Sequence, residues 1–269
     1  MADKNKLQEL VDAVRLNARY KSISEDLIRR VGLQELQKRA NLKQAVKATR
    51  SKLHQVGGAY QESRMPYDEW REELAGLPQD AYDPAVVDFA SRVMHKHAST
   101  RERFPIREEF FQRTLASICP VHSVLDLACG LNPLALSWMP LAEDAVYYAC
   151  DIYENMTTFV GDFLDHCGVE NHISVCDLTS ETPKQEVQVA FLLKTIPCLE
   201  QMDKTIGPRL LEEINAQHLL VSFPTRSLHG KNKGMIKHYH KHFEELVDGR
   251  SWQVRSYQYF EELAFLVSK

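Results

Sequence analysis

Three aspartates in the middle of the chain each end a short apolar run, and their type and spacing suggest a binding site. They are Asp126, Asp151 and Asp177. The runs that they end are residues 123–126, 145–151 and 172–177. Such runs are typical of buried parallel strands, and an open α/β sheet binds its ligand beyond the carboxyl ends of the strands. The sequence therefore predicts a site in which these carboxylates meet.

A turn of small residues follows the first run. Gly130 breaks the strand, and Asn132 with Pro133 predicts the N-cap and first turn of a helix. Ala128 and Gly130 would let a ligand approach the backbone closely. The dinucleotide fingerprint G-x-G-x-x-G and the P-loop G-x-x-x-x-G-K-[ST] are both absent from the sequence, so a ligand without phosphates fits better.

An adenosyl group fits the three strand ends. Asp151 can accept hydrogen bonds from both ribose hydroxyls, and Asp177 can accept one from the adenine amino group. Adenosine without phosphates suggests S-adenosylmethionine as the cofactor. Aspartates that only cap the turns after their strands are the alternative, and three strand ends in consecutive strand–helix units favour the ligand.

The bulk composition indicates a folded protein of one large or two modest domains. The chain has 269 residues, of which 44% are hydrophobic, and residues 1–17 carry charges throughout. We expect no secretory signal, no membrane span and a cytoplasmic location. The six cysteines form no C-x-x-C pair, so neither a metal site nor a disulfide framework is indicated, and small buried thiols are expected.

The net charge of −4 conceals a basic N-terminus. Residues 1–55 contain thirteen Lys and Arg against six Asp and Glu. Apolar spacing predicts helices over 3–18, from Ser24 to an interruption at Gly32, and over 42–53. A basic region on an otherwise acidic protein is either a solvated surface or a nucleic-acid footprint, and composition leaves both open.

The third of these helices carries its cations on one face. Lys43, Lys47 and Arg50 recur at helical spacing, and Lys52 follows them. The opposite face is apolar, so the helix can pack on one side and lie along a phosphate backbone with the other. An ordinary amphipathic surface helix is the alternative.

Three later segments are also candidates for ligand contacts. Ser99, Thr100 and Glu102 predict a helix N-cap, whereas nearby Arg103 can instead pair with a carboxylate of the ligand. A fourth strand, 187–193, precedes Lys194, Thr195 and Pro197, and the proline either ends the strand or shapes a site loop. The third segment is a basic loop over 224–234, which follows a strand over 218–223. A helix is expected over 235–247. Two antiparallel strands over 252–259 and 261–267 would then complete the sheet.

Five sets of sequence strings together resemble the aminoglycoside-resistance 16S rRNA (guanine(1405)-N7)-methyltransferase family. They are Lys52-Leu-His54 with Gly58-Ala-Tyr60, His97-Ala-Ser-Thr-Arg-Glu-Arg103, Asp126-Leu-Ala-Cys-Gly-Leu-Asn-Pro-Leu-Ala135, Leu192-Leu-Lys-Thr-Ile-Pro197, and Ser222-Phe-Pro-Thr-Arg-Ser-Leu228 with Lys233-Gly-Met235. The resemblance implies an α/β fold, a Rossmann-like class I S-adenosylmethionine-dependent methyltransferase sheet with an N-terminal all-helical domain. Residues 1–103 would dock on rRNA, and residues 104–269 would form the methyltransferase domain.

The resemblance also implies which residues line the cofactor pocket. Arg103 would pair with the methionine carboxylate, Asp151 with the ribose and Asp177 with adenine. Together with Gly130 from the turn, the expected cofactor residues are Tyr60, His97, Ala98, Ser99, Arg103, Ala128, Asp151, Asp177, Leu178 and Leu193.

The implied reaction is methylation of N7 of guanine 1405 in the helix 44 decoding region of 16S rRNA, with the 30S subunit as partner and aminoglycoside resistance as the result. N7 carries a lone pair, so no catalytic base is nominated. The substrate-side candidates are Lys194, Thr195, Pro197, Arg226 and Ser227. The RNA-binding candidates are Lys43, Lys47, Arg50, Lys52, Lys231 and Lys233. A non-catalytic RNA-binding protein and a methyltransferase acting on another substrate are the alternatives.

Overall fold

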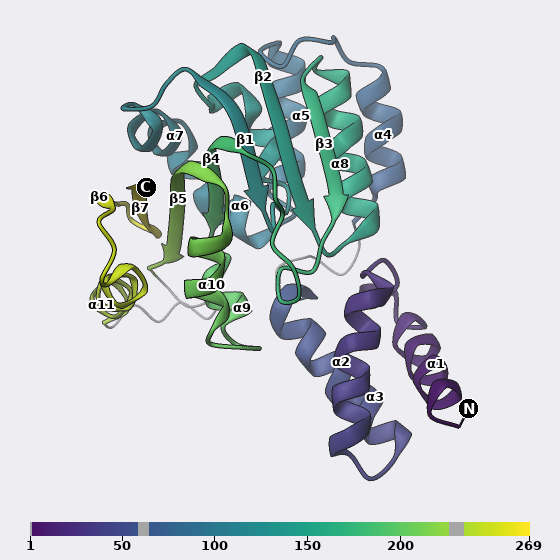
Figure 1. Ribbon diagram of the computed structural model, residues 1–269. Coiled ribbons are helices and arrows are strands. Elements are labelled where there is room, and N and C mark those ends of the chain that lie inside the picture. The colour runs from purple at the N-terminus through teal and green to yellow at the C-terminus, as the bar shows by residue number, and fades with distance from the viewer. Residues whose placement is uncertain (1, 59–64, 226–233) are drawn as a thin grey trace.

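The computed structural model describes residues 2–58, 65–225 and 234–269, and a seven-stranded sheet forms its centre (Figure 1). The strand order is β3-β2-β1-β4-β5-β7-β6. The strands are β1 (Val121–Leu127), β2 (Leu141–Asp151), β3 (Glu170–Val175), β4 (Val187–Leu193), β5 (Ala216–Pro224), β6 (Gln253–Gln258) and β7 (Glu262–Ser268).

The first five strands are parallel, and the last two are antiparallel. β1 pairs with β2 and β4, β2 with β3 and β4 with β5, all in parallel register. β7 is antiparallel to both β5 and β6, which confirms the expected closing pair. Because β1 to β5 run in one direction, their carboxyl ends lie at one edge of the sheet. That edge is where the predicted aspartates were expected to meet.

Three helices form a bundle before the sheet: α1 (Ala2–Arg15), α2 (Glu25–Lys38) and α3 (Leu42–Leu53). The predicted interruption at Gly32 is wrong, because α2 continues through this residue. A Cβ at position 32 would lie 2.4 Å from Cδ2 of Leu10 on α1. The glycine therefore allows two helices to approach closely and does not end one of them.

The bundle is seated at the carboxyl edge of the sheet. In Figure 1 it lies beyond the ends of β1, β2 and β3. The amide of Ser24 donates to the carbonyl of Ile152 at 2.8 Å, and the amide of Glu154 donates to the carbonyl of Ser22 at 2.8 Å. The chain segment just before α2 thus bonds directly to the segment that follows β2.

Further helices cover the two faces of the sheet. They are α4 (Tyr67–Ala75), α5 (Pro84–Met94), α6 (Ala98–Arg103), α7 (Arg107–Leu115), α8 (Glu154–His166), α9 (Ile196–Leu199), α10 (Ile206–Glu213) and α11 (Met235–Val247). On α4, the rings of Tyr67 and Trp70 lie 5.6 and 5.5 Å from that of Phe159 on α8. Thus α4 packs on α8, which follows β2 in the chain. The domain boundary at 103/104 stays a prediction. No helix in the described ranges is both long and apolar enough to cross a bilayer.

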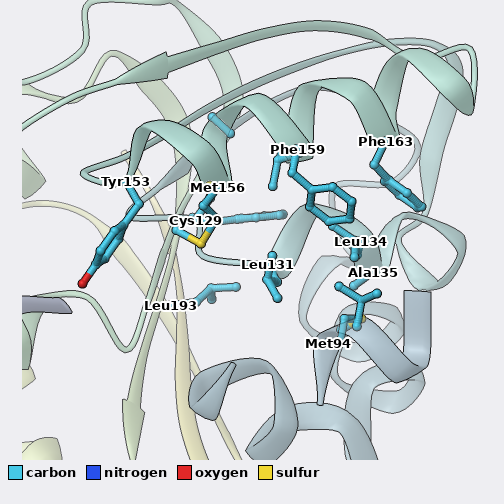
Figure 2. Close-up of a cluster of buried hydrophobic side chains, with 14 of the residues drawn as sticks. Met94, Cys129, Leu131, Leu134, Ala135, Tyr153, Met156, Phe159, Phe163 and Leu193 are labelled. Carbon is cyan, nitrogen blue, oxygen red and sulfur yellow. The ribbon is translucent and has the colours of Figure 1, made fainter. Parts of the chain in front are cut away.

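A buried apolar cluster fixes the turn after β1 (Figure 2). Met156, Phe159 and Phe163 on α8 lie against Leu131 and Leu134 of that turn, and all five are almost fully buried. The 3₁₀ helix η4 (Asn132–Trp138) follows. Packing on both sides holds this turn in one conformation, so the backbone below the predicted ligand is rigid.

Candidate functional site

A cavity opens at the carboxyl edge of the sheet and encloses about 810 Å³ of non-protein space, part of it open solvent. Its wall contains residues from the segment that follows α3, from α6, α8 and α9, and from the ends of β1 to β4. They are Val56, Gly57, His97, Ser99, Arg103, Asp126, Ala128, Cys129, Asn132, Asp151, Ile152, Tyr153, Met156, Cys176, Asp177, Leu178, Leu193, Lys194, Thr195, Cys198 and Leu199.

Asp151 ends β2 and is held by backbone amides. The amide of Gly130 donates to Oδ2 at 2.9 Å, and the amide of Ile152 donates to Oδ1 at 2.7 Å. Burial raises the pKa of this carboxyl to about 6, although the amide donors oppose the shift. Gly130 has a φ of 54°, a conformation that favours glycine. The turn therefore presents Asp151 to the cavity as an acceptor.

Asp126 lies deeper, at the end of β1. Its Oδ2 accepts from the amide of Asn132 at 2.7 Å and from the hydroxyl of Tyr147 at 2.9 Å. Burial raises the pKa of this carboxyl to about 7. The predicted N-cap role of Asn132 is wrong, because Leu131 occupies the cap position and the Asn132 side chain bonds to Asp126. The side-chain oxygen of Asn132, which a capping role would require, accepts instead from Nη1 of Arg103 at 2.9 Å.

Asp177 lies two residues beyond β3 and is bonded to the N-terminal bundle. Its Oδ2 accepts from Nε and Nη2 of Arg30 on α2 at 2.9 and 2.7 Å. Its Oδ1 accepts from the amide of Thr179 at 3.0 Å. Asp177 and Leu178 both line the cavity, so a helix of the bundle holds one wall of the site.

A buried charged cluster forms the opposite wall. Glu262 on β7 accepts from Arg103 Nη2 at 2.7 Å, and Nζ of Lys194 lies 3.5 Å from its other oxygen. Lys194 also pairs with Glu102 at 2.7 Å. Burial pushes the pKa of Glu262 upward, but Arg103 and Lys194 together outweigh burial and hold it below its usual range. The two cations and two carboxylates balance in charge.

Lys194 adopts a backbone conformation that is rare for a side-chain-bearing residue. Its φ is 61° directly after β4, a strained value. The amide of Lys194 donates to the hydroxyl of Ser222 at 3.0 Å, and this hydroxyl donates to Glu262 at 2.5 Å. The next side chain, Thr195, donates from its hydroxyl to the carbonyl of Leu127 at 3.1 Å. The loop after β4 is therefore tied to β1, β5 and β7.

His97 is the N-cap of α6, so the N-cap predicted at Ser99 and Thr100 is wrong. The hydroxyl of Thr100 donates instead to the carbonyl of Met94 at 2.5 Å. A Cβ on Gly130 would lie 2.7 Å from the His97 ring. Burial, together with the nearby charge of Lys194, lowers the pKa of His97 to about 4, so the ring is neutral at pH 7 and packs over the turn after β1.

The structure brings most of the predicted cofactor residues to one cavity. The predicted residues that line the cavity are His97, Ser99, Arg103, Ala128, Asp151, Asp177, Leu178 and Leu193. Ala98 is buried in the first turn of α6, and the backbone amide of Gly130 donates a hydrogen bond to Asp151. Tyr60 lies outside the described residues.

Some of the substrate-side candidates lie at the cavity, and others lie outside the described residues. Lys194 and Thr195 line the cavity, and Pro197 lies in α9 next to it. Arg226, Ser227, Lys231 and Lys233 lie outside the described residues. The strained conformation of Lys194 makes it the best supported of these candidates.

The predicted cationic face of α3 is split between exposed and bonded side chains. Lys43 and Lys47 are exposed. Arg50 donates to the carbonyl of Ala13 on α1, and Lys52 pairs with buried Glu35 at 2.9 Å. Arg50 and Lys52 thus also stabilise the bundle itself, which leaves Lys43 and Lys47 as the more available cations.

Sequence reasoning missed the partners that come from distant segments. No role was assigned to Glu262 or to Arg30 from the sequence. A glutamate inside an apolar strand is a signal of a buried charge with a partner, so Glu262 was detectable. Arg30 had no local signal.

Comparisons with known proteins identify the family of this chain. The family model described as "Ribosomal RNA methyltransferase (FmrO)" matches residues 16–266. A protein of Micromonospora rosea called 16S rRNA (guanine(1405)-N(7))-methyltransferase is 34% identical over 267 residues, which cover 98% of this chain and 97% of that protein. A protein of Frankia casuarinae with the same name is 35% identical, with 97% and 95% covered.

A solved structure shares the whole fold. The 16S rRNA methyltransferase RmtF in complex with S-adenosyl-L-homocysteine superposes with a TM-score of 0.81 at 31% identity, over 98% of both chains. The sheet and the N-terminal helices are therefore those of a class I S-adenosylmethionine-dependent methyltransferase with an added helical region. Because the family model extends over nearly the full length, the chain belongs to the ribosomal RNA methyltransferase (FmrO) family.

Proposed function

We propose that this chain transfers the methyl group of S-adenosylmethionine to N7 of guanine 1405 of 16S rRNA in the 30S subunit. One observation carries the proposal: the cavity at the strand ends presents Asp151 and Asp177 in a chain that is 34% identical, nearly end to end, to an enzyme named for that reaction. The cavity is lined by residues at the ends of parallel strands, and the positions of its acceptors suit ribose and adenine.

The two walls suggest how the cofactor is oriented. Asp151 would accept from the ribose hydroxyls, and Asp177 lies toward adenine. Arg103 uses three of its five N–H groups on Glu262 and Asn132. The two that remain, counted over the described residues, would bind the methionine carboxylate. The cofactor would then extend from the β2 and β3 ends toward β7.

The reaction requires alignment and no proton removal. N7 of guanine has an in-plane lone pair, so a general base is unnecessary. In-line positioning can contribute roughly 7–11 kcal/mol to such a step. The guanine must also leave its stack, which costs a few kcal/mol, so part of the RNA binding energy is used for extrusion.

Lys194 fits the substrate side of this scheme because its charge is balanced. The methylated guanine is cationic, so an unpaired lysine aimed at the ring would oppose the product. Glu102 and Glu262 lie 2.7 and 3.5 Å from its Nζ. The ion cluster therefore lets Lys194 position the loop after β4 without adding net positive charge beside the ring.

The N-terminal bundle is the proposed contact with rRNA, at the helix 44 decoding region. Its surplus of basic residues suits a phosphate backbone, with Lys43, Lys47, Arg50 and Lys52 as candidates. Lys43 and Lys47 are exposed. Reversing both (Lys43→Glu, Lys47→Glu) should abolish co-sedimentation with 30S subunits and leave cofactor affinity unchanged. Undiminished sedimentation of this variant would refute the docking face.

The biological consequence would be aminoglycoside resistance. Methylation of N7 adds positive charge and bulk to the guanine, and it would weaken the binding of cationic drugs of the 4,6-disubstituted 2-deoxystreptamine class by repulsion. We place this activity in the cytoplasm, where 30S subunits are.

The proposal is tested by offering three substrates. Purified protein and labelled S-adenosylmethionine are incubated with 30S subunits, with naked 16S rRNA and with free guanosine. We expect label in 30S subunits alone, and a primer-extension signal at guanine 1405. Label on guanosine would indicate a small-molecule enzyme, and binding of 30S subunits without any label would indicate a non-catalytic RNA-binding protein.

A further inference from the structure

The N-terminal bundle contacts the cofactor cavity at three places. The backbone of Ser24 bonds to that of Ile152, as described above. Gly57, which follows α3, lines the cavity, and a Cβ there would lie 2.9 Å from both Ile152 and Tyr153. The third contact is Arg30 with Asp177. The bundle therefore forms part of the cofactor site as well as the proposed RNA-binding face.

Arg30 holds Asp177 of the cavity wall and Thr179 two residues further along the chain. Its Nε and Nη2 donate to Oδ2 of Asp177 at 2.9 and 2.7 Å, and Nη2 also donates to the hydroxyl of Thr179. The Thr179 hydroxyl in turn donates to Oδ1 of Asp177 at 2.5 Å. Both carboxylate oxygens of Asp177 are thus oriented: Oδ2 by Arg30 on α2, and Oδ1 by Thr179 in the same loop as Asp177.

The pair is well shielded from water. Asp177 is 9% exposed and Arg30 is 30% exposed. A cofactor in the cavity would cover Asp177 further, and a neutral adenine amino group cannot compensate a buried negative charge. If Arg30 were absent from the cofactor-bound protein, the Asp177 carboxylate would be buried without an opposite charge, which is unfavourable in free energy. Arg30 is therefore expected to stay in place when the cofactor binds.

We infer that Arg30 is a positioning residue for the cofactor: from the RNA-docking bundle it fixes the wall formed by Asp177, Leu178 and Thr179. This inference rests on the proposed use of S-adenosylmethionine. Arg30 does not touch the cofactor in this scheme and acts through Asp177. Neighbouring Arg29 offers a matched comparison, because it points away to Glu25, with its Nε 2.8 Å from Oε1.

The test is calorimetric titration of the full chain with S-adenosyl-L-homocysteine. We expect Arg30→Met to bind about fivefold more weakly than the wild type, a loss of about 1 kcal/mol. Arg29→Met should bind as the wild type does. Equal affinity of Arg30→Met and wild type would overturn the inference.

A double-mutant cycle separates positioning from a general loss of structure. In the Asp177→Asn background the Arg30→Met change should have almost no further effect on affinity, because its route to the cofactor is already broken. An equal fivefold loss in both backgrounds would overturn the inference. Thr179→Val removes the hydroxyl that Arg30 also holds, and it serves the same cycle if Arg30→Met does not fold.

Failure of the proposed function has a different signature. If the wild-type chain does not bind S-adenosyl-L-homocysteine, the proposed cofactor is wrong, and the inference about Arg30 falls with it. If the wild type binds and Arg30→Met binds equally well, the proposed function stands and the positioning role is wrong.

Discussion

The two sides of the cavity depend on buried carboxylates whose pKa values move in opposite directions: Asp126 and Asp151 line the cavity, whereas Glu262 lies behind its lining residues Arg103 and Lys194. At the ends of β1 and β2, burial raises the pKa of Asp126 to about 7 and that of Asp151 to about 6. On β7, Glu262 is fully buried, yet its pKa lies below its usual range because Arg103 and Lys194 outweigh the effect of burial. Burial alone does not determine the pKa of an acid, because neighbouring charges can outweigh its effect.

The difference suggests separate tasks for the two walls. Asp151 is bonded by neutral amide donors, so it retains acceptor strength for neutral ribose hydroxyls. Glu262 pairs with Arg103 and Lys194, and this pairing would fix both side chains next to the charged parts of the proposed cofactor and substrate. The first wall presents an acceptor, and the second presents an organised ion cluster.

The largest effect is expected from removing the charge of Glu262. In Glu262→Gln, Arg103 and Lys194 would be buried side by side without their shared carboxylate. Breaking a buried pair costs about 3–5 kcal/mol of unfolding free energy. Urea unfolding at pH 7.5 measures this loss.

A surface glutamate provides the control for that experiment. Glu245 on α11 is 62% exposed and lies 3.6 Å from Lys241, so Glu245→Gln should change the unfolding free energy by no more than about 0.5 kcal/mol. If Glu262→Gln were as stable as this control, the ion cluster would not be the stabilising element described here.

The second expected effect is a pH dependence from the first wall. The folded-state pKa of Asp126 is about 7 and the ordinary value is 3.8, so the folded protein holds this proton more tightly. The stability that Asp126 contributes is present at low pH and is lost as the pH rises through 4 to 7. Between pH 5 and pH 7.5 this loss is on the order of a few kcal/mol.

The substitution Asp126→Asn should remove that loss. Unfolding by urea at both pH values compares the variant with the wild type, and we expect the variant to show the flatter profile. Glu262 works in the opposite sense, because its lowered pKa contributes stability that is lost as the pH falls below its ordinary 4.5. An identical pH profile for Asp126→Asn and wild type would contradict the raised pKa.

A smaller effect is expected on cofactor affinity. Asp151→Ala removes the proposed ribose acceptor and should weaken the binding of S-adenosyl-L-homocysteine by about 2 kcal/mol, roughly 30-fold. Calorimetric titration measures the affinity. Asp144→Ala is the matched control, since Asp144 lies on the same strand with its side chain 82% exposed. Equal affinities for the two variants would rule out the ribose assignment.

The first wall could be predicted from the sequence because its signals are local. Apolar runs placed Asp126 and Asp151 at strand ends, and the residues of the following turn identified Gly130. The helix over 235–247 and the closing antiparallel pair were also found from local patterns. Such features depend on neighbours within a few positions.

The second wall and the bundle contact depend on residues that are distant in sequence. Arg103 and Glu262 are 159 positions apart, and Arg30 and Asp177 are 147 apart. Gly32 was misinterpreted for the same reason, since its neighbour Leu10 is on another helix. Local propensity assigns a glycine or an arginine to the surface, and tertiary packing overrides it here.

The central claim is that this sheet edge delivers a methyl group to one base of the small ribosomal subunit. The most direct measurement incubates the purified chain with methyl-labelled S-adenosylmethionine and unmodified 30S subunits, then maps the label along 16S rRNA. The account predicts a single methyl group per subunit, on N7 of guanine 1405. Subunits that remain unlabelled, or that carry the label at another base, would contradict it.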